Sequence, residues 1–209
     1  MVTTKQVPPA VPPVVEITPP PASPAPTAPA VAPPAPRPVP RYTYLSPAPP
    51  AAGDRAAAER TFTQAVEAHQ AGRLADALRL YHAATQADPA MFEAYYNLGL
   101  AASQAGQTAR SLTAYEQALA LQPDAAEARY NFALGLKQAG YPADAANELN
   151  RVLAAHPEHT NARIALANLY AQQLGQPGKA REHYRQVLER DPRHPQADTI
   201  RHWLVQNPG

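Results

Sequence analysis

From about residue 55 onward, apolar residues recur three and four positions apart, the spacing that places them on one face of an α-helix. The clearest stripe is formed by Tyr95, Leu98, Gly99 and Ala102. A second stripe follows a short Gln-Ala-Gly sequence and is formed by Leu112, Tyr115, Ala118 and Leu119. The residue before a proline is disfavoured in the α conformation, so this helix is expected to end before Pro123. The pattern predicts a helix, a glycine turn, a second helix and a short loop containing proline.

The same pattern returns about every 34 residues. Four glycines mark the turns, at successive intervals of 34, 34 and 35 residues: Gly72, Gly106, Gly140 and Gly175. Four prolines mark the loops at the same three intervals: Pro89, Pro123, Pro157 and Pro192. A period of this length is typical of stacked helical units, none of which can bury its apolar face alone. We therefore expect an all-α chain of repeats, an architecture whose common role is to offer a binding surface.

The second unit resembles the tetratricopeptide repeat, whose pattern is an aromatic residue, Leu-Gly, Tyr, and then Ala, an aromatic residue and Pro. The matching residues run from Tyr95 to Gly99 and continue with Tyr115 and Pro123. The resemblance divides residues 54–209 into four repeats, over 58–91, 92–125, 126–159 and 160–193, the last one residue longer. It implies a right-handed α-solenoid of four helix-turn-helix repeats. A short helix over about residues 195–206, which contains Trp203, is expected to cap the stack.

Residues 1–53 have no counterpart in that family. The first 50 residues hold 18 of the 26 prolines and only four charged residues. Prolines this dense exclude a helix, because each one lacks an N–H donor and clashes with the preceding turn. We expect a disordered, Pro/Ala-rich spacer that can be removed without loss of stability. Within it, residues 41–45 (Arg-Tyr-Thr-Tyr-Leu) are also expected to be disordered, the alternative being that they dock on the first repeat.

Composition and charge argue against several classes of function. The chain has no cysteine, which excludes disulfides, thiolate catalysis and cysteine-based zinc sites. Three basic residues and one acidic residue give the first 50 residues a charge of +2, and 15 basic against 16 acidic residues give the rest −1. Neither part offers a basic surface for nucleic acid. Nucleotide-binding and hydrolase motifs are absent, and His156 and His159 have no third ligand nearby, so we expect no enzyme, cofactor or metal site.

The sequence leaves the cellular compartment open. It has no apolar run long enough to span a membrane, and its first residues lack the apolar core of a secretory signal. The expected location is the cytoplasm, or the periplasm if a signal or anchor precedes the spacer. Three lysines against 15 arginines, with abundant alanine, indicate a GC-rich bacterial genome.

The family resemblance implies that the first helices of the repeats line a concave groove. By their register, the apolar candidates for that groove are Phe62, Val66, Tyr96, Leu100, Tyr130, Leu134 and Ile164. The alternative is that these side chains belong to the core. In some relatives, asparagines at the positions of Asn97 and Asn131 hold the backbone of an extended peptide, because an amide can donate and accept hydrogen bonds together. The alternative is that asparagine is simply common there.

Glutamines recur 34 residues apart at the expected ends of the first helices: Gln70, Gln104, Gln138 and Gln172. They form either a row of amides along the rim of the groove or a set of good helix formers in a solvated last turn. Taken together, the residues predict a non-enzymatic module that binds a peptide or protein segment in the concave groove, as a scaffold or assembly adaptor. The alternatives are the soluble part of an envelope-anchored bacterial protein and a self-associating structural oligomer.

Overall fold

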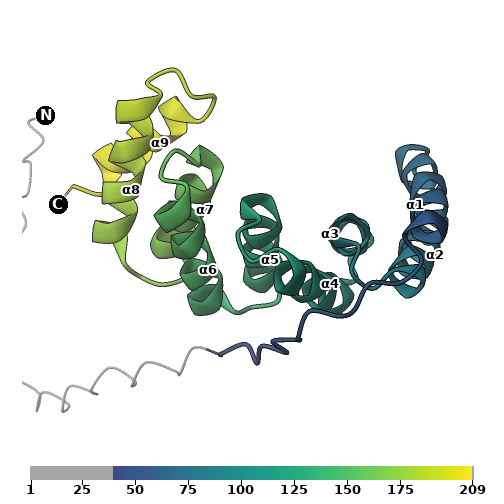
Figure 1. Cartoon of the computed structure of the whole chain (residues 1–209). Helices are drawn as coiled ribbons and strands as arrows, with labels where there is room; N and C mark the ends of the chain where they lie inside the picture. The colour runs from purple at the N-terminus through teal and green to yellow at the C-terminus, as the bar shows by residue number, and fades with distance from the viewer. Residues whose placement is uncertain (1–39, 209) are drawn as a thin grey trace, which may run out of the picture. The chain divides into compact units, whose positions relative to one another are not determined.

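The structure is a computed structural model that describes residues 40–208 (Figure 1). The prediction of a disordered spacer falls, for residues 1–39, outside the described residues. Within residues 40–208 there are nine α-helices and no β-strand, which confirms the all-α prediction.

Eight of these helices form four pairs, each joined by a tight turn. The first helices of the pairs are α1 (Arg55–Gln70), α3 (Phe92–Gln104), α5 (Ala126–Gln138) and α7 (Thr160–Gln172). The second helices are α2 (Leu74–Ala87), α4 (Thr108–Leu121), α6 (Pro142–Ala155) and α8 (Pro177–Arg190). Each helix packs on its partner and on the next helix along the chain, so the pairs stack in sequence order. A ninth helix, α9 (Ala197–Gln206), packs on α8.

The turns within the pairs depend on glycine. Gly72, Gly106, Gly140 and Gly175 have φ values of 72°, 71°, 85° and 60°. This left-handed region is unfavourable for residues that carry a Cβ atom, whereas glycine adopts it readily. The periodic glycines of the sequence therefore mark the turns, as predicted.

Large side chains on the second helices fill the space inside and between the pairs. Tyr81, Tyr115, Leu149 and Tyr184 hold equivalent positions and are at most 5% exposed. Small residues face them on the first helices and let the helices approach closely. At Gly99 the approach is closest, because a Cβ atom there would lie 2.6 Å from a ring carbon of Tyr115.

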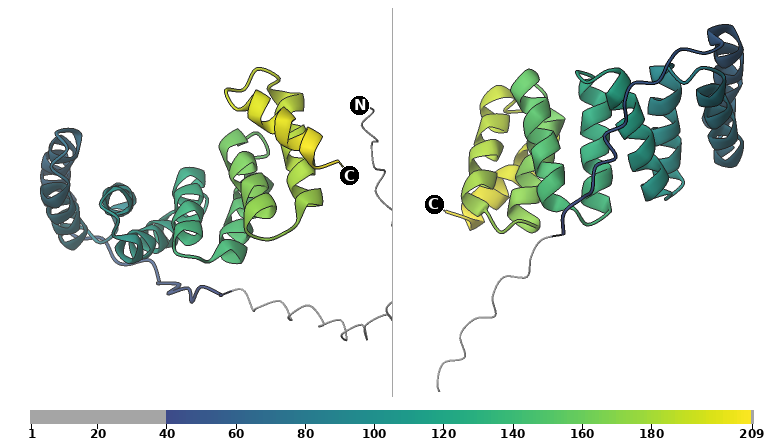
Figure 2. Two further views of the ribbon diagram at one scale, coloured as in Figure 1. Left: turned by 180° about the vertical axis from the view of Figure 1, so that it is seen from behind. Right: turned by 60° about the horizontal axis from the view of Figure 1, so that its bottom comes forward.

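The stack is curved, and the first helices lie on its inner side. Helix α5 contacts both α3 and α7, so the first helices of the second, third and fourth pairs lie side by side. The second helices form the outer side, and Figure 2 shows the stack from two further directions. None of the described helices is both long enough and apolar enough to cross a membrane.

Helix α9 covers the last pair. The ring of Trp203 lies 4.9 Å from the ring of Tyr184, measured between centroids, and Ile200 is buried. The predicted contact between Trp203 and Tyr184 is therefore present. Val205, on the same helix, is 79% exposed, so one side of α9 is apolar and packed while the other faces solvent.

Candidate peptide-binding surfaces

The inner side of the stack carries a ladder of apolar side chains, two on each of three first helices. The pairs are Phe62 and Val66 on α1, Tyr96 and Leu100 on α3, and Tyr130 and Leu134 on α5. Residues four apart in a helix lie one above the other on one face, and all six side chains are partly exposed. We call these six residues the inner ladder. Each side chain is partly buried and partly exposed, so it contributes to the core and also to the inner surface.

The fourth first helix does not extend the ladder. Ile164 is only 7% exposed and belongs to the hydrophobic core around α6, α7 and α8. Ile164 lies 34 residues after Tyr130, at the equivalent position of the repeat, but neighbouring side chains bury it. We therefore leave Ile164 out of the candidate surface.

The two asparagines are already engaged within the structure. Asn97 Nδ2 donates to the backbone oxygen of Glu93, 2.8 Å away on the same helix. Asn131 Nδ2 donates to the hydroxyl of Tyr96 at 3.2 Å, which links α5 to α3. An amide NH2 group has two hydrogens, so each asparagine can still donate to a peptide carbonyl. Their predicted role in binding stays a prediction.

The predicted glutamines end the four first helices. Gln104 and Gln138 are exposed, as are Gln70 and Gln172. Gln104 Oε1 lies 2.8 Å from Nε2 of His69, which ties the rim of the second pair to that of the first. The four glutamines are therefore exposed at equivalent helix ends, and their role as a row of amides along the groove stays a prediction.

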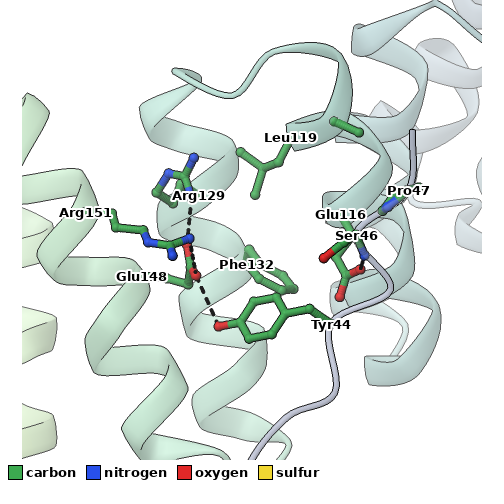
Figure 3. A pocket seen from close by; sticks show the side chains of 10 residues that line it. Tyr44, Ser46, Pro47, Glu116, Leu119, Arg129, Phe132, Glu148 and Arg151 are labelled. Atoms are coloured by element: carbon green, nitrogen blue, oxygen red, sulfur yellow. Dashed lines mark hydrogen bonds and ion pairs between the residues drawn. The ribbon is translucent and has the colours of Figure 1, made fainter. Parts of the chain in front are cut away.

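A second surface, which the sequence does not predict, lies on the outer side of the stack between α4, α5 and α6. Its acidic groups are the carboxylates of Glu116, Asp144 and Glu148, which are 5%, 1% and 1% exposed. We call this surface the acidic groove. Residues 41–46 lie in it as an extended chain, and we call them the docked segment (Figures 1 and 3).

Asp144 holds the start of the docked segment. Arg41 Nε donates to Asp144 Oδ1 at 3.0 Å, and a terminal guanidinium nitrogen lies 2.8 Å from the same oxygen. The backbone N–H of Tyr42 donates to Oδ2 at 2.8 Å. One carboxylate thus recognises both the side-chain charge and the backbone of the segment, through the charge-assisted bonds that are the strongest in proteins.

Glu116 holds the end of the docked segment. Its Oε2 accepts from the backbone amides of Leu45, at 2.7 Å, and Ser46, at 3.2 Å. Ser46 has a φ of 45°, in the left-handed region that residues other than glycine rarely adopt. That conformation lets two successive N–H groups point at one oxygen.

Glu148 contacts the middle of the docked segment, where its Oε1 accepts a hydrogen bond from the hydroxyl of Tyr44 at 3.1 Å. It is also paired with Arg129, at 2.7 Å, and with Arg151, at 3.2 Å. Burial, and next the charge of Glu148, raise the pKa of Tyr44 well above its usual value, so the hydroxyl stays a donor. Figure 3 shows these side chains converging around a cavity of about 230 Å³.

Aromatic contacts complete the groove. The ring of Tyr42 packs edge-on against Tyr141 and Phe132, with centroids 5.3 and 5.9 Å apart, and Tyr44 packs against Phe132 at 6.0 Å. Residues two apart in an extended chain point to the same side, so both tyrosines face the helices. Burial, and then the carboxylate of Glu116, raise the pKa of Tyr42 as well.

These contacts correct two expectations for residues 41–45. They are ordered against the helices, and they dock on the second and third repeats instead of the first. The physical reason is that buried carboxylates and aromatic rings supply bonds and apolar area that composition alone does not reveal. Removing this stretch is therefore expected to lower the stability of the repeats.

The signal that sequence reasoning missed is a break in the repeat. At the position of Glu116, the preceding repeat has His82 and the following repeat has Asn150. The equivalents of Asp144 are Arg110 and Lys179, and those of Glu148 are Ala114 and His183. Carboxylates at all three positions occur only in the groove that holds the docked segment.

The chain continues from the docked segment to α1 through a second acidic contact. Gly53 N donates to Asp88 Oδ1 at 2.9 Å, and Arg55 Nε lies 2.8 Å from Oδ2 of the same residue. The hydrogen bond from Gly53, followed by that from Ala90, lowers the pKa of Asp88 despite its burial. Within residues 40–208, no group of three or more His, Asp or Glu side chains is arranged to hold a metal ion.

Comparison with protein families identifies the repeat. Residues 92–125 match a family model described as a tetratricopeptide repeat, and residues 136–204 match a second model with the same description. No curated protein matches the sequence significantly.

Solved structures share the fold at low sequence identity. The structure of MamA superposes with a TM-score of 0.62 and 21% identity, covering 65% of this chain and 78% of that one. YrrB, described as a TPR protein with an unusual peptide-binding site, gives 0.63 and 22%, covering 71% and 76%. A tetratricopeptide repeat protein from Parabacteroides merdae gives 0.67 and 23%, covering 72% and 60%. At these identities the likeness shows the fold alone.

Proposed function

The chain belongs to the tetratricopeptide repeat family, and from this premise we propose that it is a non-enzymatic adaptor that binds an extended segment of another protein along the inner ladder. Stacked helical repeats are interaction scaffolds, and their curvature creates an extended inner surface for a partner. The observation that carries the proposal is the inner ladder itself. Three successive first helices present two partly exposed apolar side chains each, in one register.

The chemistry of the ladder favours an extended apolar partner. Aromatic and aliphatic side chains that are half in contact with water gain free energy when a partner covers them. Tyr96 and Tyr130 add hydroxyl groups beside this apolar surface, and Tyr96 already accepts a hydrogen bond from Asn131. Amphipathic side chains of this kind are enriched where proteins bind one another. The structure of YrrB, which has the same fold, is described as having a peptide-binding site, which agrees with this proposal.

The proposal is tested with peptides selected from a random display library on the full-length chain. Selected peptides are measured by fluorescence anisotropy against the wild type and against Leu100→Glu and Leu134→Glu. Both positions are partly exposed, so each variant is expected to fold, which far-UV circular dichroism checks. A charge in the ladder is costly to cover with apolar groups, so we expect binding to weaken at least tenfold.

The matched control is Thr113→Glu, which adds the same charge at an exposed position of α4, on the outer side. It is expected to bind the selected peptides as the wild type does. Peptides that bind the wild type, Leu100→Glu and Leu134→Glu equally well would refute the ladder as the binding surface.

A further inference from the structure

We propose that the acidic groove is a second peptide-binding site. It is specific for extended segments in which an arginine is followed by one aromatic residue directly after it and a second aromatic residue two positions further on, as in Arg41, Tyr42 and Tyr44. The docked segment begins with Arg41-Tyr42-Thr43-Tyr44 and is then a tethered ligand, which occupies the site in cis and competes with such a segment from another protein. This site lies on the outer side of the stack and is independent of the inner ladder.

The groove requires an occupant with hydrogen-bond donors. Among the described residues, every hydrogen bond accepted by Asp144 and Glu116 comes from the docked segment. With the segment in place, both carboxylates are almost fully buried. A buried charge without partners is strongly unfavourable, so these two positions are adapted to a bound chain and not to tight packing of the repeats alone.

Three features of the groove select the sequence of the occupant. Asp144 pairs with a guanidinium group by two of its nitrogens, a geometry that lysine cannot reproduce. Phe132 and Tyr141 form a surface for two aromatic rings on one side of an extended chain. Glu148 accepts the hydroxyl of the second ring, which favours tyrosine at that position.

The equivalent groove one repeat earlier lacks these carboxylates. It is a cavity of about 500 Å³, lined among others by His82, Arg110 and Ala114. In that groove Arg110 takes the place that Asp144 has in the acidic groove. A peptide arginine would therefore meet a like charge there. The two grooves occupy equivalent places in the repeat, and we attribute the choice between them to the charges that line them.

The docked segment is partly open to solvent, so a competing peptide has access to it. Along residues 40–52, no backbone–backbone hydrogen bond joins the segment to the helices, so every hydrogen bond between them involves a side chain of the helices. The side chain of Arg41 is 65% exposed, and Leu45 is 57% exposed. Ser46 has the unfavourable φ of 45°, a strain that a separate peptide with glycine at this position would avoid.

The segment also leaves room beside it. The cavity of about 230 Å³ lies next to Tyr44 and Ser46 and is bordered by Leu119 and Phe132 (Figure 3). A partner chain with a larger apolar side chain at the position of Pro47 would fill more of this space. Such a partner would make contacts that the docked segment does not make.

The test uses a fluorescent peptide of residues 39–47 and two forms of the full-length chain. One is the wild type, and the other is the emptied variant, which carries Arg41→Ala, Tyr42→Ala and Tyr44→Ala. A ligand tethered by a short linker acts at an effective concentration of about millimolar, so the wild type should exclude the peptide. We expect the emptied variant to bind the peptide at least tenfold more tightly than the wild type.

Substitutions in the groove, made in the emptied variant, locate the site. Asp144→Asn and Glu116→Gln should each weaken peptide binding at least tenfold, because each removes a charged acceptor of the segment's donors. The control Asp124→Asn removes an exposed carboxylate from the loop after α4 and should leave binding unchanged. A peptide with alanine in place of its arginine should bind at least tenfold more weakly than the parent peptide. Thermal unfolding by circular dichroism checks that each variant is folded.

Three results would overturn the proposal. The first is a folded emptied variant that does not bind the peptide, or binds it no better than the wild type does. The second is peptide binding that persists in both Asp144→Asn and Glu116→Gln. The third is a wild type that forms dimers in sedimentation analysis and an emptied variant that does not, which would place the segment in the groove of a second copy.

Discussion

Two glycines at the centre of first helices provide a sharp test of the packing described above. Gly99 in α3 and Gly135 in α5 are both buried and both helical, so replacing either with alanine changes the intrinsic helix propensity by the same amount. They differ in what a new Cβ atom would meet. At Gly99 it would lie 2.6, 2.8 and 2.9 Å from three ring carbons of Tyr115. At Gly135 the nearest atom is a methyl carbon of Leu112, at 3.0 Å.

The free-energy terms can be separated. Alanine is favoured over glycine in a helix interior by about 1 kcal/mol, and this gain is common to both variants. Overpacking a rigid core site costs about 1–3 kcal/mol. Tyr115 is 1% exposed and cannot swing away, whereas the end of the Leu112 side chain can shift by a few tenths of an ångström. Gly99→Ala should therefore be about 1–3 kcal/mol less stable than Gly135→Ala.

The assay is thermal and urea unfolding of the full-length variants, followed by far-UV circular dichroism. For a chain of this size, each 1 kcal/mol corresponds to about 2–4 °C in the unfolding midpoint. Because the propensity term cancels, the difference between the two variants reports how much more the contact with Tyr115 costs than the contact with Leu112. Equal stability of Gly99→Ala and Gly135→Ala would refute the close approach of α3 and α4 at this ring.

Three further predictions concern the ends of the stack and its titrating groups. The fluorescence of Trp203 should be blue-shifted in the native state and shift to the red on unfolding, and a water-like native emission would show that α9 is detached. Truncation after Pro192 should increase aggregation, measured by light scattering. The hydrogen bond from Gly53 lowers the pKa of Asp88, so its stabilisation is present above the usual value of 3.8 and is lost as the pH falls through the lower folded value. Urea unfolding should accordingly show Asp88→Asn to be less stable than the wild type at neutral pH, with a smaller difference in acid; a constant difference would contradict this. Burial lowers the pKa of His183, so protonation favours the unfolded chain and stability should fall as the pH drops below 6.5, an effect that His183→Gln should remove; an unchanged pH profile in that variant would count against it.

The sequence alone determined the repeat architecture, because each of its causes is local. A glycine in a turn, a proline in a loop and an apolar stripe along a helix act over a few residues, and their period appears directly in the chain. The same register selected the inner ladder, since residues such as Tyr96 and Tyr130 differ by one period. Ile164 shows the limit of this reasoning, because its exposure depends on neighbouring pairs that the register does not describe.

Only the tertiary structure decided where the outer site lies. Asp144 is 103 residues from Arg41, and Glu116 is 71 residues from Leu45, so nothing local relates them. Stacking the pairs brings α4 beside α5 and α6, and this assembles three carboxylates into one groove. Composition indicates disorder for the proline-rich stretch, because a chain judged by itself has too little apolar area to order it. The folded repeats supply the missing partners, and an extended segment becomes ordered where its charges and aromatic rings match theirs.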